Sequence, residues 1–140
     1  MIVYAFYGLG KSTFVARHKA ECRDIDEQDY MLSVDFPQNY VEHIYGNHES
    51  EKIVFTTVRG GIIDDNDVSL AFIPMNMDMI AERLRWRGTS ETFIKELLNR
   101  DDEIFDELLK RFPNAIIVPD DKYLTDYEDL IMERSKEIGS

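Results

Sequence analysis

The stretch AFYGLGKST, residues 5–13, combines small residues with a lysine that is followed by a serine and a threonine. Its spacing keeps the pattern G-x-x-x-x-G-K-[ST], with Ala5 in the place of the first glycine. In such a loop the glycines let successive backbone N–H groups turn toward an anion. Alanine is tolerated in the first place where φ stays below zero. The pattern predicts a phosphate-binding loop, and the alternative is a glycine turn beside a surface lysine.

Each position near the end of this loop has an expected role. Lys11 is expected to reach the β- and γ-phosphates of a nucleotide and to act as a catalytic cation, and Ser12 is expected to hold Mg²⁺. A helix that begins here adds a partial positive charge at its N-terminus. The residues expected to bind the nucleotide are Gly8, Leu9, Gly10, Lys11, Ser12 and Thr13.

Two carboxylates lie at the expected end of the second strand, Asp24 and Asp26. Alternation along a strand points both to one side, where they face the phosphate site and the acceptor. One would bind Mg²⁺ through water, for which we name Asp24, and the other would hold an acceptor hydroxyl or take its proton. The third strand ends Thr56-Thr57-Val58 without aspartate, so either Asp24 replaces the usual Mg²⁺-orienting carboxylate or Mg²⁺ relies on Ser12 and water. The alternative is that Asp24 and Asp26 have no such role and belong to an acidic loop exposed to solvent.

Arginines supply the remaining candidate charges. Arg59 follows the third strand directly, where its guanidinium would clamp the phosphate or carboxylate of an acceptor. The segment ERLRWRG, residues 82–88, places Arg83 and Arg87 on one helix face and points Arg85 elsewhere. We expect Arg83 and Arg87 to neutralise a transferring phosphoryl group. For all of these arginines the alternative is a solvated surface.

Alternating strands and helices must position these residues. Short runs of β-forming residues predict five strands, over residues 1–6, 23–26, 52–58, 69–74 and 115–118. Helical spacing predicts helices over residues 11–21, after Pro37, over 77–86, over about 90–112 and from 125 to about 138. Residues 59–68 leave room for little more than a helical turn. This alternation implies an α/β fold with a parallel sheet covered on both faces and ligands at the carboxyl ends of the strands.

Length and composition bound the remaining possibilities. The 140 residues favour one domain over 1–140, and a hydrophobic content of 44% supports a real core. The formal charge of −12 argues against broad binding to DNA or RNA.

The single cysteine, Cys22, excludes an intramolecular disulfide and fits a reducing cytoplasm. No signal peptide precedes the first motif, and no apolar run reaches the ~18 residues that a membrane span needs. We expect a cytoplasmic monomer or homodimer with no membrane and no nucleic-acid partner.

With the loop, the DID segment and RLRWRG in these places, the chain resembles small phosphate-loop kinases of the nucleoside monophosphate kinase type. More narrowly, NYVEHI (39–44), ERLRWRG and KYLTD (122–126) are similar to segments of short nucleotide-kinase-like proteins encoded by bacteriophages. The resemblance implies a three-layer phosphate-loop fold with strand order 2-3-1-4-5 and ATP and Mg²⁺ as ligands. It also implies a small arginine-bearing lid around residues 83–100.

We therefore expect ATP-dependent phosphoryl transfer to a small-molecule nucleotide, a nucleoside monophosphate and by resemblance a deoxynucleotide. The DxD pair also resembles that of kinases related to shikimate kinase, whose acceptor is a hydroxyl; Asp26 would then be a general base. A third reading is a nucleotide-binding protein without catalysis, because the aspartate after strand three is missing. The sequence leaves the acceptor open.

Overall fold

Five short strands form one sheet in the spatial order β2-β3-β1-β4-β5, and every neighbouring pair is parallel. A computed structural model describes residues 1–25, 32–49, 52–57 and 61–139. The strands are β1 (Ile2–Ala5), β2 (Cys22–Asp24), β3 (Ile53–Thr56), β4 (Val68–Pro74) and β5 (Ile116–Val118). Tyr4 on β1 lies opposite Thr56 on β3 and Ala71 on β4. The predicted α/β class, the parallel sheet and the strand order are confirmed.

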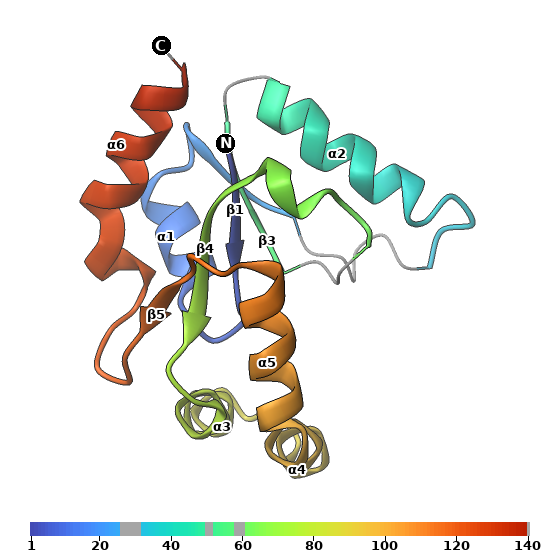
Figure 1. Ribbon diagram of the computed structural model, residues 1–140, viewed down its shortest axis with the longest axis vertical. Helices are drawn as coiled ribbons and strands as arrows, with labels where there is room; N and C mark the ends of the chain where they lie inside the picture. Colours follow the sequence, from blue (N-terminus) through green and yellow to red (C-terminus); the bar gives the residue numbers. More distant parts are fainter. Residues whose placement is uncertain (26–31, 50–51, 58–60, 140) are drawn as a thin grey trace.

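Helices cover both faces of the sheet. They are α1 (Lys11–Arg17), α2 (Gln38–Glu49), α3 (Met77–Trp86), α4 (Glu91–Asn99), α5 (Asp101–Arg111) and α6 (Glu128–Gly139), with the 3₁₀ turns η2 (Asp65–Asp67) and η3 (Leu124–Tyr127). Figure 1 shows α1 and α6 on one side of the strands and α2 and α5 on the other. In the described part of the chain, no helix is long and apolar enough to span a bilayer.

The strands are apolar on both sides because both sides are buried. On one face Phe14 of α1 packs against Phe55 of β3, with ring centroids 5.2 Å apart. On the other face Tyr40 of α2 packs into a buried cluster with Ile2 and Val54. Each such side chain contributes ~1.5–3 kcal/mol when fully buried. This two-sided burial fixes the strand ends that carry the candidate site.

The helix predicted over residues 90–112 is wrong in one respect, because it is two helices that meet at Arg100. The backbone leaves the helical region there, with φ −113° and ψ 13°. Asp101, Asp102 and Glu103 then occupy the first turn of α5, where acidic side chains favour a helix N-terminus. The chain turns at this point, so that α4 is viewed almost end-on in Figure 1 while α5 runs alongside the sheet.

The first helix is also shorter than predicted, since it ends at Arg17 rather than at residue 21. His18 closes it, and the backbone N–H of Cys22 donates to the His18 carbonyl at 2.8 Å, which turns the chain into β2. The Nε2 atom of His18 lies 2.5 Å from Oε1 of Glu128 and so joins α1 to α6.

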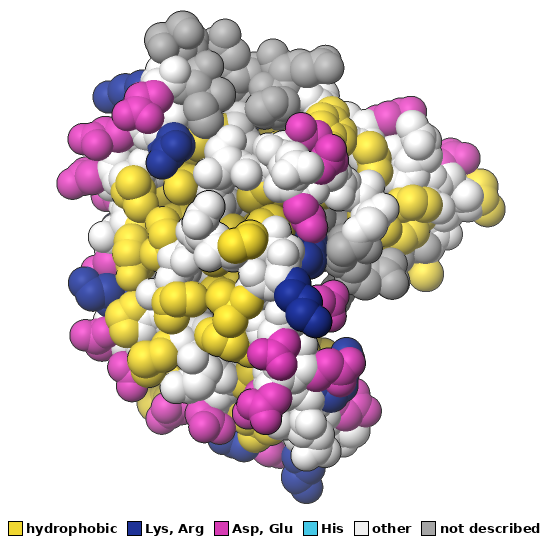
Figure 2. All heavy atoms as spheres, in the orientation of Figure 1, with side chains coloured by type: hydrophobic (Ala, Val, Ile, Leu, Met, Phe, Trp, Pro, Cys, Tyr) yellow, Lys and Arg dark blue, Asp and Glu magenta, His cyan; other side chains and the backbone are white. Residues whose placement is uncertain are grey.

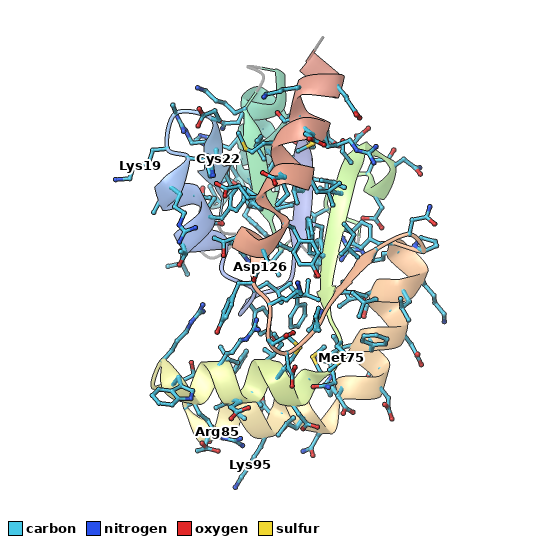
Figure 3. All side chains as sticks on the ribbon, turned by 90° about the vertical axis from the view of Figure 1, so that its left-hand side faces the viewer. Lys19, Cys22, Met75, Arg85, Lys95 and Asp126 are labelled. Atoms are coloured by element: carbon cyan, nitrogen blue, oxygen red, sulfur yellow. The ribbon has the colours of Figure 1, made fainter. Side chains whose placement is uncertain are left out.

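Helices α3 and α4 lie side by side beyond the carboxyl ends of the strands (Figures 1 and 3). Asn76 caps α3 by accepting a hydrogen bond from the Met79 N–H at 2.9 Å, and Ser90 caps α4. Between them Gly88 has a φ of +79°, a conformation that glycine adopts without strain. The segment expected to form a lid, residues 83–100, therefore consists of the end of α3, this turn and α4.

Acidic side chains dominate the outer surface, as the net charge of −12 requires. On the face shown in Figure 2 they ring a central area of hydrophobic side chains, and Lys and Arg are sparse. A binding site for an anion must therefore be built locally, from backbone N–H groups and a few placed cations.

Candidate functional site

The loop between β1 and α1 has the backbone conformation that its glycines allow. Gly8 and Gly10 have φ values of +85° and +94°. A Cβ atom on Gly10 would lie 3.3 Å from Cδ1 of Tyr123, and one on Gly8 would lie 3.1 Å from Cδ1 of Ile80. Ala5 is the last residue of β1, in an extended conformation that alanine adopts readily. Both glycines of the loop, Gly10 in the motif and Gly8 at one of its variable positions, therefore stand where a side chain would be strained and crowded.

Lys11 is the first residue of α1, and its side chain folds back over the loop. Its Nζ atom donates to the Ala5 carbonyl at 3.2 Å and also contacts the hydroxyl of Thr57. That hydroxyl donates in turn to the same carbonyl at 2.9 Å. The ammonium therefore sits at the adjoining carboxyl ends of β1 and β3. Thr57 drew attention in the sequence only as the place of a missing aspartate, and no sequence signal pairs it with Lys11.

The side chains of Ser12 and Thr13 are exposed at the start of α1. The Ser12 hydroxyl is an oxygen donor of the kind that Mg²⁺ accepts beside substrate phosphates and water. In the residues that the structure describes, no group of three or more His, Cys, Asp and Glu side chains could hold a metal. The Ser12 hydroxyl thus suits an ion that arrives with a nucleotide.

Arg83 ties three segments together next to the loop. Its guanidinium donates to the carbonyl of Gly8 at 2.9 Å, and to the carbonyls of Asp120 and Lys122 at 3.0 and 2.6 Å. It also lies over the ring of Tyr123, 3.8 Å from the centroid. The Leu124 N–H donates to the Leu9 carbonyl at 2.9 Å, which adds a further link. The structure thus brings Arg83 to the candidate phosphate loop, and its role toward a transferring group stays a prediction.

The other two arginines of ERLRWRG differ from Arg83. Arg85 pairs with Glu91 through an Nε–Oε1 distance of 3.2 Å, and in Figure 3 its side chain points away from the sheet. Arg87 is exposed and closes α3, with its backbone N–H donating to the Leu84 carbonyl at 3.1 Å. Arg87 therefore follows the last turn of α3, and its side chain is exposed to solvent.

The predicted acceptor residues are only partly described. Asp24 closes β2 with an exposed side chain, whereas Asp26 and Arg59 lie outside the described residues. Strand β3 lies between β2 and β1 in the sheet. At the usual spacing between strands, the ends of β2 and β1 are therefore ~10 Å apart. This separation suits the predicted role of Asp24, which is to act on an ion at the loop through water.

Aromatic side chains close the other side of the loop. Tyr7 stacks on Phe6 with centroids 4.2 Å apart, and the ring of Phe93 on α4 lies 6.1 Å from that of Tyr7. Burial raises the pKa of Tyr7 to about 12, an effect that the nearby Arg100 partly offsets. The Tyr7 ring is therefore neutral at physiological pH and packs the loop against the α3–α4 pair.

Comparisons with known proteins supply no family for this chain. No protein-family model matches it, and a search of curated proteins finds no significant match. The geometry of the loop and of its neighbours carries the functional conclusion.

Proposed function

We propose that this protein is an ATP-dependent kinase that transfers a phosphoryl group to a nucleoside monophosphate, with a deoxynucleotide as the favoured acceptor. One observation carries the proposal. A glycine loop with two left-handed residues leads from the central strand of a parallel sheet into a helix, and the lysine of its motif lies over the loop. Ligands of such sheets bind at the carboxyl ends of the strands, which is where this loop lies.

The donor nucleotide binds with its phosphates on the loop. The backbone N–H groups of residues 8–13 and the ammonium of Lys11 hold them, and Ser12 ligates the Mg²⁺ that accompanies ATP. Asp24 supports that ion through water. Loop 119–123 borders the loop through Tyr123, so the donor's adenine is expected on that side.

Charge neutralisation and positioning supply the catalysis. The oxygens of a phosphate acceptor are already nucleophilic, so the reaction requires no strong general base. Arg87 moves from the end of α3 to the transferring group, and Arg83 adds positive charge where the loop begins. Asp26 and Arg59 position the acceptor. The residues 83–100 that carry these arginines act as a small lid, and the fold is of the three-layer phosphate-loop type.

A transfer assay with labelled ATP, Mg²⁺ and a panel of acceptors tests the proposal. The panel holds the ribo- and deoxynucleoside monophosphates together with the matching nucleosides, which offer only hydroxyls. We expect transfer to a monophosphate, and a loss of ~100-fold in kcat for Arg87→Ala. Arg85→Ala is the matched control and should keep full activity, because Arg85 points away from the sheet.

Other outcomes of the same assay contradict the proposal. Transfer to nucleosides alone would make the acceptor a hydroxyl and Asp26 the general base. ATP binding without transfer to any acceptor would make the protein a nucleotide-binding regulator.

A further inference from the structure

We propose that Tyr7 and Phe93 form a subsite for the acceptor, where the Phe93 ring stacks on the base of a nucleotide and the Tyr7 hydroxyl donates a hydrogen bond to its phosphate. The inference rests on the proposed function and deepens it, because it states which parts the acceptor must carry. Tyr7 occupies a variable position of the loop motif, and Phe93 lies on α4 outside every motif.

The loop places Tyr7 on the side where the donor's terminal phosphate is expected. The Lys11 ammonium, which is expected to reach the β- and γ-phosphates, donates to the carbonyl of Ala5, two residues before Tyr7. Tyr123, on the side expected for the adenine, borders Gly10 instead. Since an acceptor must meet the terminal phosphate, it must bind on the Tyr7 side of the loop, where α4 lies beyond the carboxyl ends of the strands (Figure 1).

Aromatic contacts hold the Tyr7 ring between the loop and α4. It stacks on the buried Phe6 ring with centroids 4.2 Å apart, and it lies 6.1 Å from the Phe93 ring at an interplanar angle of 49°. Phe93 is 43% exposed, although it is a large apolar side chain. A ring that is held on one side and exposed on the other offers a face on which a nucleobase can stack. This arrangement favours an acceptor with a base over a sugar phosphate.

The Tyr7 hydroxyl is a hydrogen-bond donor without a protein acceptor in the part of the chain that the structure describes. The side chain is half-buried, and burial raises its pKa to about 12, so the phenol keeps its proton at physiological pH. A tyrosine that is largely removed from water normally has a partner for its hydroxyl. An oxygen of the acceptor's phosphate would supply that partner.

Arg100 adds positive charge at the same place. It closes α4, and its guanidinium lowers the pKa of Tyr7 against the larger effect of burial, so the two side chains lie within electrostatic reach. Arg100 also pairs with Glu103 at an Nη2–Oε1 distance of 3.4 Å, but both side chains are more than half exposed, so this pair is weak. In a chain with a formal charge of −12, a cation beside the phenol favours an anionic group over a neutral one.

The test removes one part of the ligand and one part of the site at a time. The ligands are the four deoxynucleoside monophosphates, deoxyribose 5-phosphate, which lacks the base, and the deoxynucleosides, which lack the phosphate. Phe93→Leu removes the aromatic face and keeps an apolar side chain, Phe93→Tyr restores that face, and Tyr7→Phe removes only the hydroxyl. NMR titration gives each Kd, with Mg²⁺ and a non-hydrolysable ATP analogue present so that no transfer occurs.

Trp86→Leu is the matched control. Trp86 on α3 is 88% exposed and lines a surface that it shares with Arg85, whose side chain points away from the sheet (Figure 3). Its replacement removes an exposed aromatic ring of similar size at a place where no acceptor is expected.

We expect Phe93→Leu to raise the Kd of the monophosphates about tenfold and to leave that of deoxyribose 5-phosphate unchanged, because only the base stacks on the ring. Tyr7→Phe should raise the Kd of the monophosphates and of deoxyribose 5-phosphate about tenfold and leave that of the deoxynucleosides unchanged. Phe93→Tyr and Trp86→Leu should bind every ligand as the wild type does.

Unchanged monophosphate binding in either Phe93→Leu or Tyr7→Phe would overturn the inference. So would losses that are equal for all ligands, because they would show a general disturbance of the loop. Transfer to monophosphates by the wild type, together with either result, would leave the proposed function intact. Conversely, the expected Kd pattern in a protein that transfers nothing supports the subsite and contradicts the proposed kinase activity, and a wild type that binds no monophosphate contradicts both.

Discussion

The guanidinium of Arg83 lies 3.8 Å from the ring centroid of Tyr123, and this stack joins the β1–α1 loop to the chain that follows the last strand. The Tyr123 side chain also borders Gly10, where an added Cβ atom would lie 3.3 Å from its Cδ1 atom. A charged planar group gains from contact with an aromatic face and from fork-shaped hydrogen bonding. Arg83, Tyr123 and the loop thus form one packed unit.

Replacing Arg83 should destabilise the fold. Arg83→Ala removes charged hydrogen bonds to three backbone carbonyls together with the stack, and we expect a loss of about 2 kcal/mol in the free energy of unfolding. Urea denaturation measures it. Arg85→Ala is the control, because its exposed pair with Glu91 should contribute less than ~1 kcal/mol. Equal effects of the two substitutions would show that Arg83 does not tie the segments together.

The conformation of Gly10 gives a second prediction. Gly10→Ala places a side chain at a φ of +94° and against Tyr123, and should cost ~1–2 kcal/mol of unfolding free energy. Gly46→Ala is the matched control on α2, where an added Cβ meets nothing within 4 Å and alanine favours the helix by ~0.5–1 kcal/mol. Thermal melts of both variants should therefore shift in opposite directions. A Gly10→Ala variant as stable as Gly46→Ala would argue against this loop conformation.

Cys22 provides a reporter of folding. The residue is fully buried on β2, and burial raises the pKa of its thiol from 9.0 to about 11. Since the thiolate is the reactive form, a disulfide reagent at pH 8 should modify the native protein at least about 100-fold more slowly than the urea-unfolded chain. Equal rates in the two states would mean that the β2 edge of the sheet is open.

Tyr7 gives a prediction about pH. Its folded pKa of about 12 exceeds the ordinary value of 10.0, so the native state retains the phenol proton more strongly than the unfolded chain. This contribution to stability is complete below pH 10 and is lost as the pH rises from 10 toward 12, by at most about 1.4 kcal/mol per pH unit. Urea denaturation at pH 8 to 11 should show the decline, and Tyr7→Phe should reduce its slope. An identical slope in both proteins would contradict the burial of the Tyr7 hydroxyl.

The sequence predicted the elements that local patterns determine. The apolar runs of β1 and β3 predict strands of a sheet that is buried on both faces. Gly88 predicts that α3 ends close before it, and the helix does end at Trp86. The break at Arg100 was missed because apolar residues continue at helical spacing across it. The acidic run at 101–103 was the available sign of a new helix start.

The candidate site was predictable only where it lies within one stretch of chain. The β1–α1 loop is such a stretch, and the positive φ values of Gly8 and Gly10 agree with the turn that its sequence predicts. The partners that position it come from far along the sequence: Thr57 lies 46 residues beyond Lys11, and the Arg83–Gly8 contact spans 75. Such contacts depend on strand order and helix packing, which no local spacing encodes.

Replacement of Lys11 tests the central claim, nucleotide binding by the loop, most directly. The measurement is ATP affinity by calorimetry and phosphoryl transfer at saturating Mg²⁺ for Lys11→Ala. Lys95→Ala is the control, because that exposed side chain on α4 points away from the sheet (Figure 3). We predict that Lys11→Ala loses ~3–4 kcal/mol of transition-state stabilisation while Lys95→Ala behaves as the wild type. Unchanged ATP affinity and turnover in Lys11→Ala would contradict the account.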